Sequence, residues 1–188
     1  QDNLGSSGGQ YTASKYAYSK GADYIWLMDD DVVAKPNCLE ILLKYQNKYD
    51  ILCPLRYNIE DVYLNDVKKI TLDNPFKSIW REIISKDDLS NEAVPVEVFT
   101  FEGPLIHKSV FEKIGLPEKD FFIYGDDTEF SLRALKKILC KRDPVKARAP
   151  AGDWNREVGD RAFIQLLSFH SSRRPCFTGS MGTFAQSF

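Results

Sequence analysis

The feature that most constrains the fold is an apolar run that ends in three consecutive carboxylates. Residues 24–28 have the length of a buried strand, and Asp29, Asp30 and Asp31 follow them directly. Like charges at the end of a buried strand repel one another, and a divalent cation would relieve that repulsion. Mg²⁺ and Mn²⁺ prefer oxygen ligands such as carboxylates, and if the chain turns here, Asp29 and Asp31 would reach one ion. A solvated acidic turn explains the triplet equally well, so the triplet alone leaves both interpretations open.

The segments around this run predict an α/β domain. Ahead of it, turn-forming residues 3–9 are expected to precede a helix over about 10–20, with Tyr11, Ala13, Ala17 and Tyr18 available for its buried face. Behind it, residues 37–45 show helical spacing and residues 49–54 read as a short strand. A strand, a helix and another strand in this order favour a mixed, mostly parallel sheet flanked by helices.

Composition excludes several classes of protein. The 188 residues are 43% hydrophobic, which is enough for one domain with a proper core. A net charge of -2 argues against a general nucleic-acid binder. No apolar run approaches the roughly 18 residues of a membrane span. The four cysteines have no metal-ligand spacing, which favours reduced thiols in a cytoplasmic protein.

The middle of the chain is less regular. Residues 61–63 and 69–72 suggest a small hairpin, and residues 76–85 a short helix carrying Trp80. Such an excursion from an α/β sheet often carries specificity. A strand is expected over 94–101, and a helix over 108–114 that ends at Gly115. His107 lies in this packed region, where a single histidine is more often structural than catalytic.

A second acidic group follows another apolar run. Residues 121–124 lead into Asp126, Asp127 and Glu129, and an apolar helical stripe continues beyond them. One of the two aspartates could cap that helix. A cap needs one carboxylate, however, and three lie within four residues. Two such groups in one small domain suggest a metal site facing a general base.

These motifs together resemble family 2 of the inverting glycosyltransferases, in the branch of rhamnosyl- and galactofuranosyltransferases. The matching stretches are residues 3–9, residues 23–31 with the three aspartates, and residues 99–133 with Gly103-Pro104 and Gly125-Asp126-Asp127. The resemblance implies the GT-A fold, incomplete at the N-terminus. The chain has no initiating Met, and the nucleotide-binding βαβ half of such enzymes is expected before Gln1.

The resemblance also implies a role for each matching residue. Asp29 and Asp31 would hold Mn²⁺ or Mg²⁺ against the diphosphate of a nucleotide-sugar donor, a UDP- or dTDP-sugar. Asp127 would be the catalytic base, with Asp126 and Glu129 orienting the base or the acceptor. The nucleotide side of the cleft would be lined by Asn3, Gly8, Gly9 and Asp30.

The implied reaction moves a sugar from the donor to a hydroxyl of a glycan or lipid-linked acceptor, with inversion. The family also implies polysaccharide synthesis for the cell envelope, with peripheral association at the cytoplasmic face of a membrane.

The end of the chain departs from the pattern. Residues 1–140 are expected to form the partial GT-A catalytic domain, and residues 141–188 an atypical tail, either frameshifted, joined or disordered. Lysine dominates over arginine up to residue 140, whereas arginine dominates beyond it. The family often supplies a histidine as a third metal ligand, and His170 is the candidate, in a setting that argues against it.

Two alternative functions remain open. Asp29 to Val33 also resembles the nucleophile motif of haloacid-dehalogenase-like phosphatases, which depend on Mg²⁺. That alternative leaves residues 3–9 unexplained, and no convincing Ser, Thr or Lys motif lies between the acidic groups. The other alternative is a catalytically inactive fragment that binds a sugar or a metal without turnover.

Overall fold

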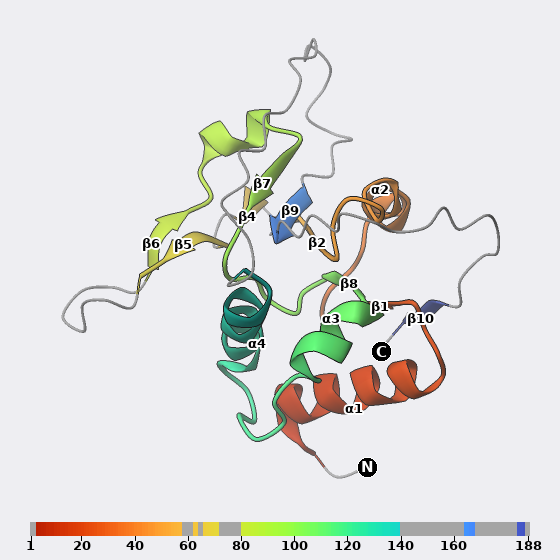
Figure 1. Ribbon diagram of the computed structural model, residues 1–188. Helices are drawn as coiled ribbons and strands as arrows, with labels where there is room; N and C mark the ends of the chain where they lie inside the picture. The colour runs from red at the N-terminus through yellow and green to blue at the C-terminus, as the bar shows by residue number, and fades with distance from the viewer. Residues whose placement is uncertain are drawn as a thin grey trace.

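A six-stranded mixed sheet forms the centre of the computed structural model, which describes residues 3–57, 62–63, 66–71, 80–139, 164–167 and 184–186 (Figure 1). The strand order is β10-β1-β8-β2-β9-β7. The strands are β1 (Tyr24–Trp26), β2 (Ile51–Pro54), β7 (Ala93–Pro95), β8 (Leu105–His107), β9 (Ile164–Leu167) and β10 (Phe184–Gln186). The helices are α1 (Gly5–Ser19), α2 (Cys38–Lys44), α3 (Lys108–Ile114) and α4 (Asp126–Ala134).

The described strands do not bear out the expectation of a mostly parallel sheet. β1 and β2 run in the same direction, as their connection through α2 predicts, but β8 lies between them and is antiparallel to both. The pair β2–β9 is also antiparallel, whereas β1–β10 and β7–β9 are parallel. The turn before β8 is the physical reason, because it returns the chain into the gap between β1 and β2 in the opposite direction.

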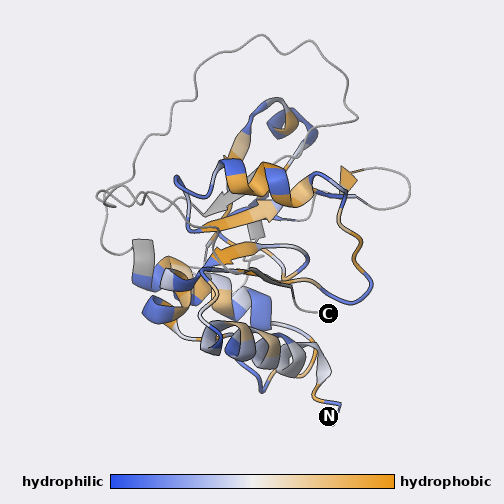
Figure 2. Ribbon diagram, turned by 90° about the vertical axis from the view of Figure 1, so that its right-hand side faces the viewer, coloured by the Kyte–Doolittle hydropathy of each residue, from blue (hydrophilic) through white to orange (hydrophobic). Residues whose placement is uncertain are grey.

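The strands β1, β2 and β8 are buried on both faces, because their alternate residues point to opposite sides and a hydrophobic core lies on each side. Ile25 and Leu27 pack toward α1, α3 and α4, in a core that includes Phe111 and Phe130. On the other face, Trp26 packs against α2 in a second core with Leu42. Figure 2 shows α2 on one side of the apolar strands and α1, α3 and α4 on the opposite side. The predicted strand at residues 24–28 is therefore confirmed over β1, and the helix and strand that follow are confirmed as α2 and β2.

The expected turn at residues 3–9 is wrong for most of its length, because α1 already begins at Gly5. The side chain of Asn3 accepts a hydrogen bond from the amide of Gly5 at 3.0 Å, and the amide of Ser7 donates to the carbonyl of Phe122 at 3.2 Å. These contacts hold a glycine-rich segment in a helix that its composition disfavours. The buried face of α1 is also more polar than expected: Ser7, Gly8, Gln10, Ser14 and Ala17.

Two small hairpins replace the one predicted in the middle of the chain. Strand β4 (Val62–Tyr63) pairs with β3 (Arg56–Tyr57), and β5 (Val67–Ile70) pairs with β6 (Trp80–Ile83). The predicted helix carrying Trp80 is therefore wrong in its described part. Pairing with β5, ten or more residues earlier, decides the conformation, and a local pattern does not contain that information. A 3₁₀ helix at Lys86–Ser90 leads back to the sheet.

The helices on either side of the second acidic group match their prediction only in part. α3 ends at Gly115, whose φ of 85° confirms the predicted C-cap. The expected strand over 94–101 is confined to β7. Residues 121–124 are not a buried run but an exposed turn, in which Phe122 has a φ of 70°. α4 continues as a π-helical turn at Leu135–Leu139.

The remaining predictions fall partly outside the described residues. Cys38 and Cys53 are buried free thiols, whereas Cys140, Cys176 and His170 lie outside the described part. His107 accepts a hydrogen bond from the amide of Ser109 at the start of α3, which is a structural contact. Among the described helices, none combines the length and apolarity that a membrane crossing requires.

Gly103 makes a prediction about stability. Its φ is +103°, and a Cβ atom there would lie 2.8 Å from Cγ of Pro54. We expect Gly103→Ala to lower the free energy of unfolding by about 1–3 kcal/mol. Gly9 is the matched control, because a Cβ atom there meets nothing within 4 Å. Gly9→Ala in α1 should stabilise by about 0.5–1 kcal/mol, and urea unfolding of both variants compares them. Equal free energies of unfolding in Gly103→Ala and Gly9→Ala would contradict this prediction.

Candidate functional site

The first acidic group lies where β1 leaves the sheet. The carbonyl of Leu27 accepts from the amide of Gly103 at 2.9 Å, which ends the regular pairing, and the amide of Val32 turns back to the carbonyl of Asp29 at 3.3 Å. Asp29 is half-buried, and its Oδ1 accepts from Nε2 of Gln10 on α1 at 2.9 Å. Asp30 and Asp31 are exposed. The three carboxylates therefore follow the C-terminal end of β1, as the sequence predicts.

The second acidic group forms the first turn of α4. Gly125 occupies the N-cap position with a φ of 99°, so neither aspartate is the cap residue itself. Asp126 is 4% exposed. Asp127 accepts from the amide of Thr128 through Oδ1, at 2.5 Å. The buried hydroxyl of Ser131 donates to the carbonyl of Asp127 at 2.8 Å and accepts from the amide of Phe99 at 3.2 Å, which fixes α4 to the chain leading into β8.

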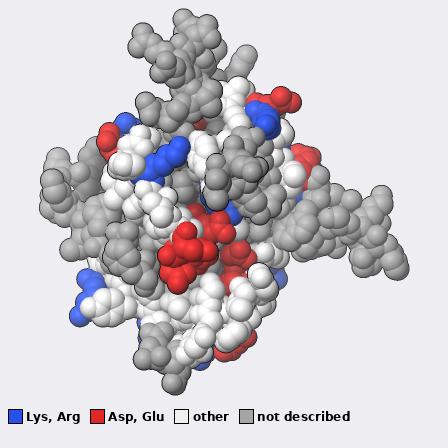
Figure 3. All heavy atoms as spheres, turned by 180° about the vertical axis from the view of Figure 1, so that it is seen from behind, with Lys and Arg blue, Asp and Glu red and all other residues white. Residues whose placement is uncertain are grey.

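The fold brings the two groups into electrostatic contact. Burial raises the pKa of the Asp126 carboxyl, and the charges of Asp127 and Asp29 raise it further. Burial also raises the pKa of Asp29, where nearby Glu102 and Asp31 add to the effect against the hydrogen bond from Gln10. Figure 3 shows acidic side chains gathered near the centre of one face. Residues about 100 positions apart therefore share one acidic centre.

Glu102 and Arg56 belong to this centre, although the sequence did not single them out. Arg56 forms ion pairs with Asp66 at 3.1 Å and with Glu102, and its side chain is 11% exposed. Burial raises the pKa of Asp127, Thr128 lowers it by hydrogen bonding, and the charges of Glu102 and Arg56 act in opposite directions. Glu102 follows an apolar run, as the other carboxylates do, and that signal could have identified it. No local pattern distinguishes Arg56.

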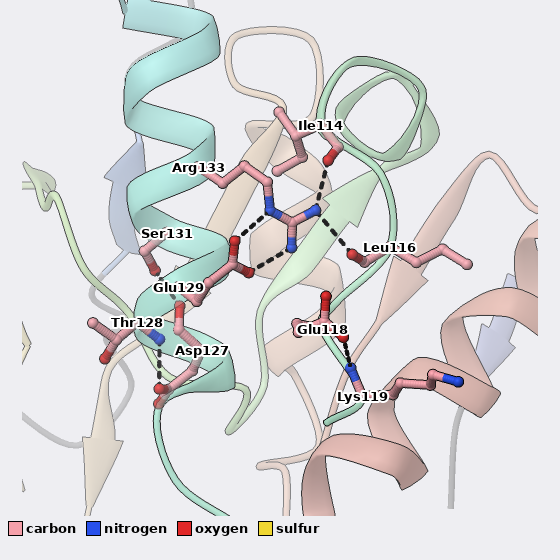
Figure 4. A network of polar contacts seen from close by, with 9 residues as sticks. All are labelled: Ile114, Leu116, Glu118, Lys119, Asp127, Thr128, Glu129, Ser131 and Arg133. Carbon is pink, nitrogen blue, oxygen red and sulfur yellow. Dashed lines mark hydrogen bonds and ion pairs between the residues drawn. The ribbon is translucent and has the colours of Figure 1, made fainter. Parts of the chain in front are cut away.

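Glu129 makes a structural contact in α4. Its carboxylate forms a two-pronged ion pair with Arg133, at 2.7 and 2.6 Å (Figure 4). The same guanidinium donates to the carbonyls of Ile114 at 2.6 Å and Leu116 at 3.0 Å. Glu129 thus ties the start of α4 to the end of α3 through Arg133. Its expected role toward the acceptor or the base stays a prediction.

The donor set of the first group fits a hard divalent cation. Among the described residues, no three His, Cys, Asp or Glu side chains come together as a ligand set. A divalent ion at Asp29 and Asp31 would therefore have to take most of its ligands from diphosphate oxygens and water. Two buried side-chain oxygens near Asp29 lack a hydrogen-bond partner, Oε1 of Gln10 and Oδ2 of Asp126. Unpaired buried oxygens beside clustered carboxylates are consistent with a cation or a polar ligand.

The predicted nucleotide-binding residues come from two places, the start of α1 and the end of β1. Asn3 is exposed at the start of α1, and Gly8 and Gly9 lie in its first turns. Asp30 is exposed at the end of β1. Gln10, from the same helix, contacts Asp29, which joins α1 to the acidic centre. The assignment of these residues to a nucleotide stays a prediction.

The buried carboxyl of Asp126 predicts a pH-dependent stability. Because its pKa is raised in the folded chain, the native state holds the proton more tightly. Stability is therefore lost as the pH rises from about 4, the ordinary value of an aspartate, through the raised pKa. We expect Asp126→Asn to raise the melting temperature at neutral pH without metal, and the gain to shrink as the pH falls toward about 4.

Asp120 provides the control, because it is an exposed aspartate on the connection that leads from α3 to α4. Asp120→Asn should change the free energy of unfolding by no more than about 0.5 kcal/mol at any pH. A destabilised Asp126→Asn variant at neutral pH would show that the buried charge is not a cost to the fold.

Comparisons with known proteins cover more than half of the chain. Residues 1–115 match the family model described as glycosyl transferase family 2. The chain is 31% identical over 144 residues to galactofuranosyltransferase GlfT1 of Mycobacterium tuberculosis, covering 73% of this chain. It is 27% identical over 145 residues to galactofuranosyltransferase GlfT1 of Mycolicibacterium smegmatis, again covering 73% of this chain. The chain spans less than half of these relatives, 45% and 46% of their lengths.

Proposed function

Because the chain belongs to glycosyl transferase family 2, we propose that it transfers a sugar from a nucleotide-diphosphate donor to a hydroxyl group, with inversion. Membership implies the GT-A fold, and the central α/β sheet is consistent with it. The observation that carries the proposal is the meeting of the carboxylates at the end of β1 with those that begin α4. A donor site and a catalytic base must lie next to each other for one transfer step.

Asp127 is the proposed base. The acceptor hydroxyl must lose a proton as its oxygen attacks the anomeric carbon, and a carboxylate can accept it. Burial raises the pKa of Asp127 above that of an ordinary aspartate, which makes it a better proton acceptor. Thr128 and the fixed start of α4 orient the side chain. Attack from the face opposite the leaving group inverts the anomeric centre.

The leaving group is proposed to lie against Asp29 and Asp31. Bound Mn²⁺ or Mg²⁺ would neutralise the charge that grows on the departing nucleoside diphosphate. Gln10 holds Asp29 in place, so that its orientation does not depend on the ligand. Asn3, Gly8, Gly9 and Asp30 are proposed to face the nucleotide.

The relatives narrow the donor to test first. Both are named galactofuranosyltransferases. The donor that we propose first is therefore galactofuranose linked to UDP or to dTDP. A glycan or lipid-linked acceptor, cell-envelope polysaccharide synthesis and the cytoplasmic face of a membrane follow as further proposals. Residues 1–140 are proposed as the catalytic part. That residues 141–188 are an atypical tail stays a prediction, although β9 and β10 of that segment pair with strands of the sheet.

The test is transfer by the protein as its gene encodes it. Donors carrying UDP or dTDP are incubated with a glycan acceptor, with and without Mn²⁺, and the products are read by mass spectrometry. Metal-dependent formation of an inverted glycoside supports the proposal. Mg²⁺-dependent hydrolysis of an aryl phosphate without transfer would favour the phosphatase alternative. Binding of the donor without either reaction would favour an inactive binding protein.

A further inference from the structure

Gln10, on α1, fixes the end of β1 through two hydrogen bonds. Its Nε2 donates to the carbonyl of Met28 at 3.3 Å and to Oδ1 of Asp29 at 2.9 Å, and the residue is 6% exposed. Both acceptors are oxygens, so the amide cannot turn over without bringing its own oxygen against them. Gln10 therefore holds the main chain just before the three aspartates as well as the first of their carboxylates.

Ser7, one helical turn earlier, holds the segment that leads into α4. Its amide donates to the carbonyl of Phe122 at 3.2 Å, and its Oγ donates to the carbonyl of Lys119 at 3.1 Å. Ser7 is fully buried, and a Cβ atom at nearby Gly5 would overlap the carbonyl oxygen of Phe122. The two segments are therefore in main-chain contact, and Figure 1 shows the connection from α3 to α4 passing the start of α1.

The turn at residues 121–124 has little packing of its own. All four side chains are exposed, and Phe122 has a φ of 70°, in the left-handed region that disfavours a side chain. A strained and exposed turn opens readily unless a neighbouring element holds it. The contacts with Ser7 hold this turn, and Asp127 lies just beyond it in α4.

α1 therefore joins the two acidic groups through its own backbone. Ser7 and Gln10 lie about one turn apart on the same face of the helix, and the hydrogen bonds of the helix keep that spacing constant. Away from α1, Ser131 fixes α4 to Phe99, so the start of α4 is held from two sides. The spacing matters in a transfer step, because a displacement of about 1 Å between reacting groups can lower the rate about 10²-fold.

We propose that Ser7 and Gln10 are positioning residues of the transfer reaction, which hold the base of α4 at a fixed distance from the donor side at the end of β1. The inference rests on the proposed function and adds two residues to it. Gln10 acts through Asp29, whereas Ser7 acts through the turn that leads to Asp127. Their effects therefore fall on different steps, Gln10 on the binding of the ion and Ser7 on the turnover.

Ser7→Ala tests the contact with the turn, because it removes the bond from Oγ and keeps the bond from the amide. In the protein as its gene encodes it, the amides of residues 120–124 should exchange with deuterium about fivefold faster. At saturating donor and acceptor, kcat should fall about tenfold, whereas the donor KM and the Mn²⁺ affinity should stay within about twofold. A role in folding alone would lower the melting temperature without this split between kcat and KM.

Gln10→Met tests the contact with β1, because methionine has a similar length and donates no hydrogen bond. Binding of Mn²⁺ alone is followed by electron paramagnetic resonance, which requires no transfer. The affinity should fall about tenfold, as it does when a metal ligand loses the group that orients it. Because Gln10 is buried, Ser7→Ala decides the question by itself if Gln10→Met does not fold.

Ser19→Ala and Lys15→Met are the matched controls. Ser19 also donates from its Oγ to a main-chain carbonyl, that of Tyr16 at 2.7 Å, but this bond stays within α1. Lys15 is exposed on the same helix. Both variants should bind Mn²⁺ and transfer sugar as the unchanged protein does.

The outcomes separate this inference from the proposed function. If Ser7→Ala transfers sugar at the original kcat, or if Gln10→Met binds Mn²⁺ as tightly as Lys15→Met, the positioning role is overturned and the transferase stands. If the unchanged protein transfers no sugar from any donor, the proposed function is contradicted, and the positioning roles that rest on it fall with it. A reduced kcat in Ser7→Ala together with weaker Mn²⁺ binding in Gln10→Met supports both.

Discussion

Asp127→Asn is expected to reduce the turnover of sugar transfer by about 10²–10⁴-fold, the range that general base catalysis contributes. Asparagine keeps the shape of the side chain and can still accept the hydrogen bond from Thr128, but it cannot take up the proton of the acceptor hydroxyl. Because the proposed base acts on the acceptor and not on the nucleotide, the affinity for the nucleotide should change little. Steady-state transfer kinetics and a nucleotide titration measure the two effects separately.

Glu129 supplies the control for this prediction. It also lies in the first turn of α4, but its carboxylate is engaged by Arg133. Glu129→Gln keeps one hydrogen bond to that guanidinium and removes no proton acceptor of the proposed reaction, so it should lower the turnover much less than Asp127→Asn does. If Asp127→Asn transfers sugar at the original rate, Asp127 is not the base.

Phe130→Ala is expected to lower the free energy of unfolding by about 3–5 kcal/mol. Phe130 is fully buried on α4, and its ring lies between those of Phe99, Phe101 and Phe111, with centroid distances of 6.4, 5.6 and 5.9 Å. Removing the ring leaves a cavity where α4 meets α3 and the chain leading into β8. Urea unfolding measures the loss directly.

Tyr124 is the control for that substitution. It is 87% exposed just before α4, so Tyr124→Ala should change the free energy of unfolding by no more than about 0.5 kcal/mol. Phe130→Leu should recover part of the stability. A loss below about 1 kcal/mol in Phe130→Ala would mean that α4 is held mainly by its polar contacts through Ser131 and Arg133.

The elements that local pattern predicts correctly are those whose apolar residues form a short continuous run or recur at helical spacing. β1 and β2 are continuous buried runs, and α2 and α3 bury helically spaced residues, so the pattern places all four. The start of α1 and the strand β6 depend on contacts that are distant in sequence, Ser7 with Phe122 and β6 with β5. Composition at those segments favours the wrong conformation, and tertiary contacts override it.

The candidate site also contains residues that local pattern predicts and residues that only the fold brings into place. Asp29, Asp31 and Asp127 stand out because charges that follow apolar runs are unusual, and the fold brings their groups together. Arg56, Asp66 and Gln10 were not predicted, because each is an ordinary polar residue until the fold places it beside a carboxylate. The family resemblance supplied the roles of the acids. It could not supply the ion pairs of Arg56, which depend on how the β2–β3 corner packs.

The most direct measurement is the thermal stability of the protein, as its gene encodes it, with UDP, dTDP or GDP and with or without Mn²⁺. A ligand that binds only the folded state raises the melting temperature by mass action. The account predicts a rise that requires both one nucleotide and the metal, and that disappears in Asp31→Ala. A rise that any nucleotide produces without Mn²⁺, or no rise with any of them, would contradict a metal-dependent nucleotide-sugar site at the end of β1.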